Sequence, residues 1–160
     1  MSAGRATLEL FGAAAKLAIL CSIAWREPVT LDRVRVRGID ATVSETIDAA
    51  REYGGRVRLV ASAQRNGHLH ASVEPQVLDG ADPLASGTGA HNVVEVRTAL
   101  AGTLTWHGAG AGGRSTASAL LADTIAAPLL ATDIGLKFTS YSFTENDSNR
   151  LRVVLAAEID

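Results

Sequence analysis

The 160-residue sequence contains a single cysteine, four prolines and only 4% aromatic residues. One cysteine excludes an intramolecular disulfide framework, so an ordinary apolar core must hold the fold together. Cys21 lies within an apolar run, which favours a buried thiol over a nucleophile. This cysteine usage fits a reducing, cytoplasmic compartment.

The chain also lacks an excess of one charge and a long hydrophobic run. Its 15 basic and 17 acidic residues give a net charge of −2 and form no cluster, so nothing favours a nucleic-acid partner. The apolar stretch from Leu8 to Trp25 is interrupted by Glu9 and Lys16, and only nine residues separate Lys16 from Arg26. A membrane span needs roughly 20 apolar residues. We therefore expect no membrane segment, and the missing cleavage site argues against a signal peptide.

The apolar content of 47% is enough to close one core, and we expect residues 1–160 to form a single domain. Apolar residues recur every three to four positions from Thr7 to Trp25, which predicts a largely buried helix. Alternation from Leu31 to Ile39 predicts a strand with one face in solvent. The capping-box spacing of Thr42 and Glu45 predicts a short helix that ends at Gly54-Gly55.

The rest of the chain predicts strands and one further helix. Asn66-Gly67 favours the tight turn of a hairpin between strands 56–63 and 69–73. Residues 79–91 have no periodicity and predict a loop over the sheet or near a site. The remaining expected elements are strands 92–98 and 103–106, a small-residue helix 115–127 ended by Pro128, and strands 136–143 and 151–159 around a polar turn at 145–149.

A glycine-rich run, Gly108 to Gly113, leads directly into Arg114-Ser115-Thr116 at the start of a predicted helix. Free backbone N–H groups and the helix dipole would favour an anion there, and Arg114 would add a fixed charge. This predicts a substrate-binding turn made by Gly108, Gly110, Gly112, Arg114, Ser115 and Thr116. The alternative is a tight strand-to-helix crossing in which Ser115 or Thr116 is an ordinary N-cap.

Glu9 and Lys16 are seven residues apart and share one helix face, with small residues between them. A small polar molecule could lie in that gap, which makes both residues catalytic candidates. The alternative is a lysine whose stem packs on apolar neighbours while its ammonium group reaches water. The four histidines lack the spacing of a metal site, so no metal is expected, although His107 could face a ligand at the glycine run.

Several of these motifs together resemble the C-terminal signature of homoserine dehydrogenases. They are Pro83-Leu-Ala-Ser86, Gly89, Asn92-Val-Val94, Gly108-Ala-Gly-Ala-Gly112, Thr116-Ala-Ser118 and Asp123. The resemblance covers roughly residues 8–127 and leaves 128–160 as a divergent strand pair. It implies an α+β domain with a mixed, largely antiparallel sheet backed by helices, which often mediates dimerisation. Asn92 joins the substrate-binding candidates through this motif.

The family's helix carries a Gly-x-Asp-x-x-x-Lys pattern whose Asp and Lys serve substrate binding and proton transfer. Here the segment reads Leu10-Phe-Gly12-Ala-Ala-Ala-Lys16, so Lys16 is kept and Gly12 stands where the family has the acid. The lysine then has no acidic neighbour one turn away. Fewer than ten residues precede the helix, so we expect no nucleotide-binding domain, no cofactor and no dehydrogenase activity in isolation.

These observations leave three functional hypotheses open. The first is a non-redox enzyme, or a subunit of one, that acts on a small amino-acid-derived substrate by displacement or cyclisation of a sulfated or phosphorylated group. This is similar to the aziridine-forming proteins of azinomycin-type antibiotic pathways. The second is a non-catalytic partner used for dimerisation or amino-acid sensing. The third is the substrate half of a split homoserine dehydrogenase. Each implies a homo-oligomer or a complex with a second small subunit.

Overall fold

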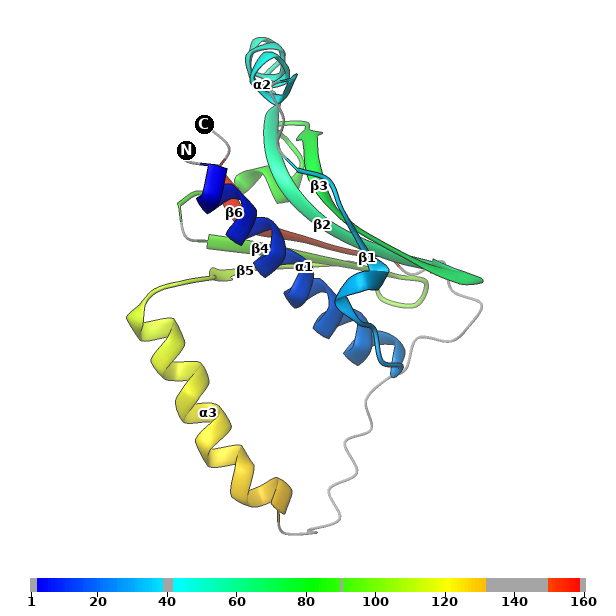
Figure 1. Cartoon of the computed structure of the whole chain (residues 1–160), viewed down its shortest axis with the longest axis vertical. Helices are drawn as coiled ribbons and strands as arrows, with labels where there is room; N and C mark the ends of the chain where they lie inside the picture. The colour runs from blue at the N-terminus through cyan, green and yellow to red at the C-terminus, as the bar shows by residue number, and fades with distance from the viewer. Residues whose placement is uncertain (1–2, 39–41, 90, 132–149, 159–160) are drawn as a thin grey trace.

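The computed structural model describes the backbone of residues 3–38, 42–89, 91–131 and 150–158, and the side chains of 10–38, 43, 45–89 and 91–126. Within these residues, three α-helices and two short 3-10 helices accompany a six-stranded sheet in the order β1-β3-β2-β6-β4-β5 (Figure 1). The helical elements are α1 (Ala3–Trp25), η1 (Leu31–Arg33), α2 (Thr42–Glu52), η2 (Pro83–Ser86) and α3 (Gly113–Ala131). The strands are β1 (Val34–Val36), β2 (Arg56–Asn66), β3 (His68–Leu78), β4 (His91–Thr98), β5 (Gly102–Ala109) and β6 (Arg150–Glu158).

Neighbouring strands run antiparallel except for β1 and β3, which are parallel. This is the expected α+β fold with a mixed, largely antiparallel sheet. The β2–β3 hairpin turns at Gly67, whose φ of 71° is the left-handed conformation predicted for Asn66-Gly67. Both strands are longer than expected. Strand β3 continues through Pro75 because its pairing with β1 ends at Val73, whose carbonyl oxygen accepts the Arg37 N–H. Beyond that point β3 is an edge strand that tolerates a missing N–H.

Helix α1 lies across one face of the sheet, which makes the main core (Figure 1). Its buried residues follow the helical period and meet the odd-numbered residues of β2, whose side chains alternate between the two faces. The buried set in α1 is Leu10, Ala13, Ala14, Leu17, Ala18 and Cys21. Full burial of a leucine such as Leu17 contributes about 1.5–3 kcal/mol, so this stripe fixes the helix on the sheet.

The opposite face of the sheet has a smaller core at one end only. Val60 of β2 and Val93 of β4 pack there with Leu78 and with Leu84 and Ala85 of η2. Away from η2, the even-numbered residues of β2 and β3 on this face are polar. The fold therefore has one helix-covered apolar face and one face that is half apolar and half polar.

The C-terminal strand departs most from the expected topology. β6 is inserted between β2 and β4 and pairs antiparallel with both. A strand expected as half of a divergent terminal pair is thus central to the sheet, and it joins the two hairpins into one layer. The other expected strand of that pair, 136–143, and the turn at 145–149 lie outside the described residues.

Three further elements differ from their expected bounds. The strand expected over 31–39 is confined to β1, because residues 31–33 form η1; Ile39 lies outside the described residues. Strand β5 extends to Ala109, so Gly108 lies in the strand rather than in the turn. Helix α3 begins at Gly113 and continues through Pro128. Proline removes one helical hydrogen bond and bends a helix, but it does not have to end one.

Among the described residues, no helix is long and apolar enough to cross a membrane.

Candidate functional site

The outer face of α1 carries the retained lysine. Lys16 is exposed, and Gly12 lies one turn before it on the same side of the helix. A Cβ atom added at Gly12 would meet no atom within 4 Å, so the place of the family's acid is open space. Glu9 lies in the same helix, but its side chain is outside the described set. Lys16 is therefore presented to solvent or to a ligand, without an acidic residue at the position one turn away.

The glycine turn is shorter than expected and spans Gly110 to Gly112. Gly112 has a φ of 118°, which only glycine adopts readily, and its carbonyl oxygen accepts the Thr116 N–H at 3.0 Å. The Ser115 hydroxyl donates to the same oxygen at 2.9 Å. Ser115 is therefore not an N-cap that accepts from the backbone, because its hydroxyl acts as a donor inside the first turn. Arg114 is exposed beside this helix start.

Asn92 is brought against the glycine turn. A Cβ atom built on Gly110 would lie 2.2 Å from the Asn92 side-chain amide, so the amide occupies the space that any larger residue at 110 would need. Asn92 pairs with Gly108 in the β4–β5 register, and strand alternation places it on the α1 side of the sheet with Val94 and Val96. The structure thus joins three predicted residues, Asn92, Gly108 and Gly110, on one side.

His107 lies on the other side. It pairs with Val93, whose fully buried side chain belongs to the core under η2. Directly opposed residues of paired strands share a face, so His107 projects away from α1 and Lys16. Its predicted role beside the glycine run therefore lacks support from the register.

A residue that the sequence analysis missed holds the loop before β4. The Arg58 side chain is only 3% exposed, and its Nη2 donates to the carbonyl oxygens of Ala85 at 3.3 Å and Gly87 at 2.8 Å. Asp82 Oδ1 accepts the Leu84 N–H at 2.9 Å and starts η2. Buried charge-assisted hydrogen bonds of this kind fix backbone geometry. The motif at 83–86 can be recognised in the sequence. Arg58, which lies 27 residues before Ala85, has no local signal that indicates its role.

Cys21 behaves as predicted for a structural thiol. It is fully buried in the core under α1, and burial raises the pKa of its thiol from 9.0 to about 11. A thiol with this pKa carries almost no thiolate at neutral pH, which excludes it as a nucleophile there. Among the described residues, no group of three or more His, Cys, Asp or Glu side chains could hold a metal ion.

The described residues do not suit a nicotinamide dinucleotide. Such cofactors sit on a glycine turn inside a parallel βαβ unit. Here the turn at 110–112 follows β5, which is an edge strand antiparallel to β4. The helix start after it can accept an anionic group, but it is not part of a dinucleotide fold.

Sequence comparison connects these features to known enzymes. The sequence model of the homoserine dehydrogenase family matches residues 5–125. The homoserine dehydrogenase of Corynebacterium glutamicum is 38% identical over 128 residues, which cover 76% of this chain and 29% of that protein. The NAD(+)-dependent homoserine dehydrogenase of Pseudomonas canavaninivorans is 39% identical over 112 residues, which cover 69% of this chain and 32% of that protein. The chain therefore spans less than a third of the length of these two relatives.

Solved structures agree with the sequence comparison. A homoserine dehydrogenase from Thiobacillus denitrificans superposes with a TM-score of 0.70 and 32% identity, over 83% of this chain and 31% of that one. The enzyme from S. aureus, at 20% identity and a TM-score of 0.64, shares the fold over 92% of this chain and 47% of its own. These matches give no support to the resemblance with aziridine-forming proteins. Profile, relatives and fold together place this chain in the homoserine dehydrogenase family.

Proposed function

We propose that this chain is the amino-acid-binding subunit of a homoserine-dehydrogenase-like assembly, and that it transfers no hydride by itself. The observation that carries the proposal is the combination on α1 of an exposed Lys16 with open space at Gly12. A lysine on an exposed helix face can bind the carboxylate of an amino acid. Proton exchange during hydride transfer would need the acidic neighbour that Gly12 replaces.

The site would be completed by a second subunit. In α3 every described side chain is exposed or half-exposed, including Leu120, Leu121 and Ile125. The outer face of α1 adds Phe11, Ile19 and Ile23, which are more than half exposed. Apolar patches of this extent are typical of interaction surfaces. A covering subunit would also exclude water from Lys16 and from the glycine turn, which strengthens electrostatic binding.

The reaction class that suits this arrangement is non-redox chemistry on an amino-acid derivative with an anionic leaving group. This requires the assembly to bring Lys16 of α1 and the start of α3 to one substrate. Lys16 would then hold the amino acid, and the N-terminus of α3 with Arg114 would stabilise the departing anion. A split dehydrogenase, in which a second chain brings the cofactor, is the alternative. The two differ in whether the completed complex oxidises homoserine when NAD(+) is present.

Calorimetric titration with L-homoserine and with NADPH tests the proposal. We expect homoserine to bind and NADPH to produce no saturable heat. The variant Lys16→Met should weaken homoserine binding by about tenfold or more, since a charge-assisted hydrogen bond is worth about 1.5–3 kcal/mol. Arg37→Gln removes an exposed cation on another part of the surface and serves as the matched control. Equal homoserine affinity in Lys16→Met and the unaltered chain, or micromolar NADPH binding, would refute it.

A further inference from the structure

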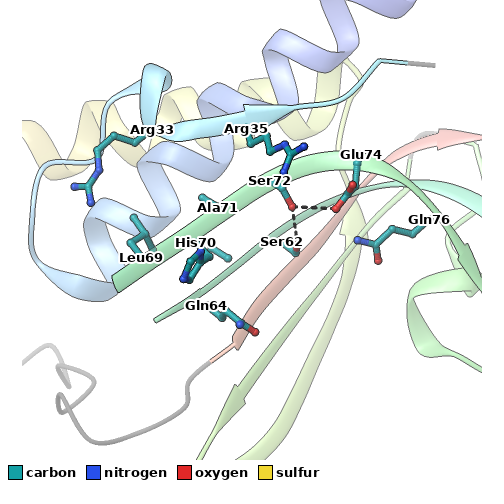
Figure 2. A pocket seen from close by; sticks show the side chains of 11 residues that line it. Arg33, Arg35, Ser62, Gln64, Leu69, His70, Ala71, Ser72, Glu74 and Gln76 are labelled. Atoms are coloured by element: carbon teal, nitrogen blue, oxygen red, sulfur yellow. Dashed lines mark hydrogen bonds between the residues drawn. The ribbon is translucent and has the colours of Figure 1, made fainter. Parts of the chain in front are cut away.

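A cavity of about 650 Å³ lies on the sheet face opposite α1, over the middle of β2 and β3 (Figure 2). Ligand sites in proteins usually occupy about 300–1,000 Å³. Lys16 and Asn92 belong to the α1 side of the sheet, so this cavity is separate from the site described above. Its lining is mostly polar, with Ala63, Leu69 and Ala71 as the apolar exceptions, which distinguishes it from an incompletely filled core.

The strand register explains why the surface is hollow here. Ser62 and Ser72 are directly opposed in the β2–β3 pairing, and their hydroxyl oxygens are 3.3 Å apart. These two short side chains make the floor. Longer side chains on the same face stand around them: Gln64, His70, Glu74 and Gln76 from the hairpin, and Arg35 from β1, which pairs with Ser72. A bowl with polar walls follows from alternation and residue size alone.

Among the described side chains, two opposite charges flank the floor. Arg35 makes no hydrogen bond or ion pair with the other described residues, and Glu74 accepts a hydrogen bond from the Ser72 hydroxyl at 3.3 Å. Arg33, at the rim, lies 3.6 Å from Glu27 and so already has an acidic neighbour. Arg35 and Glu74 are diagonal neighbours, about 4.8 Å apart across the strands and about 7 Å along them. Their charged ends can therefore contact one small ligand from two sides.

We propose that this bowl binds a small polar α-amino acid, with the ligand carboxylate on Arg35 and the ligand ammonium on Glu74. Arg35 offers the planar guanidinium that pairs with carboxylates, and Glu74 is the only carboxylate among the described residues that line the cavity. The amides of Gln64 and Gln76 and the hydroxyl of Ser62 supply both donors and acceptors for a polar side chain. An amino acid here would be bound away from Lys16, as an effector rather than as a substrate. The assignment does not depend on the function proposed for Lys16.

Calorimetric titration of the full chain with L-asparagine tests this site. Two truncated probes each remove one recognition group: succinamic acid lacks the ammonium and 3-aminopropanamide lacks the carboxylate. We expect asparagine to bind and both truncated probes to bind at least tenfold more weakly. Arg35→Gln and Glu74→Gln should each weaken asparagine binding by at least tenfold, and Glu74→Gln should leave the affinity for succinamic acid unchanged.

Two control variants show whether asparagine binds in this cavity or elsewhere on the chain. Arg97→Gln removes an exposed arginine on the same sheet face outside the cavity, and it should leave asparagine binding unchanged. Asparagine should still bind to the Lys16→Met variant, because the cavity is intact there, and Arg35→Gln should weaken binding in that background as well. The proposal is overturned if asparagine does not bind, if Arg97→Gln weakens binding as much as Arg35→Gln, or if only Lys16→Met abolishes it. Circular dichroism of each variant confirms that the fold is retained.

Discussion

Small side chains determine where the two candidate sites of this molecule have open space. Gly12 leaves space beside Lys16 on α1, and Ser62 with Ser72 makes the floor of the polar cavity. Gly110 does the reverse, because its missing side chain lets Asn92 pack onto the turn before α3. In each case the structural feature comes from a residue that is smaller than its neighbours. Lys16 beside Gly12 remains accessible, whereas Asn92 is held by packing on Gly110.

The contact between Asn92 and Gly110 predicts different outcomes for two glycines in one run. Gly110→Ala places a Cβ atom 2.2 Å from the Asn92 amide, so either the turn or Asn92 must move. We expect a loss of about 1–3 kcal/mol in the free energy of unfolding, measured by urea titration. Gly108→Ala meets nothing within 4 Å and should change stability by less than about 0.5 kcal/mol. Equal stability of the two variants would show that Asn92 is not packed on the turn.

At the scale of elements, α1 shows how strongly a periodic pattern determines a helix and how little it says about the outer face. Buried residues at positions 10, 13, 14, 17, 18 and 21 make one continuous stripe, and the exposed side is free of that constraint. Near the end of α1, Ser22 links the helix to the segment that follows it. Its hydroxyl donates to the Ala18 carbonyl at 2.8 Å and accepts the Val29 N–H at 2.9 Å, which ties the chain leaving α1 back to the helix.

The exposed glycine in α1 gives a prediction at this scale. Gly12 lies in the middle of a helix, where glycine is about 0.5–1 kcal/mol less favourable than alanine, and no contact among the described residues requires it. Gly12→Ala should therefore raise the free energy of unfolding by about that amount in denaturant titration. Gly12→Asp should be tolerated and should add a weak i, i+4 attraction to Lys16. A marked loss of stability in either variant would mean that Gly12 is closely packed in the purified protein and would contradict the open space beside it.

The elements that the sequence predicted are those determined by local signals. The pattern of α1, the Asn66-Gly67 turn and the short helix before Gly54 are all present, because periodicity and turn chemistry act over a few residues. The insertion of β6 between β2 and β4 has no local signal, since it depends on pairing across about 90 residues of chain. The same holds for the site. The glycine turn and Lys16 could be predicted. The hydrogen bonds of Arg58 to the loop before β4, and the side of the sheet on which His107 lies, depend on how distant strands pair.

For the whole molecule, the distribution of covered and uncovered surface is uneven. The β1–β3–β2 half of the sheet has α1 and α2 packed on it. In the other half, β5 is an edge strand on which Leu104 and Trp106 are 41% and 52% exposed. Helix α3 continues from that edge and extends away from the sheet (Figure 1). A 19-residue helix without tertiary packing is only marginally stable in water, and the described side chains of α3 are all exposed or half-exposed. We therefore expect a partner to cover this helix.

The last prediction therefore concerns assembly. We expect the purified chain to sediment above its 16.6 kDa monomer mass at tens of micromolar, because a second copy can cover the apolar side of α3. Leu121 and Ile125 are one turn apart, and Leu121→Glu should shift the chain toward the monomer by placing a charge in the interface. Leu100→Glu is the matched control, since Leu100 is 97% exposed in the turn at the other end of β5 from α3. A monomeric parent chain, or equal dissociation by both variants, would show that α3 is not the surface that joins two copies.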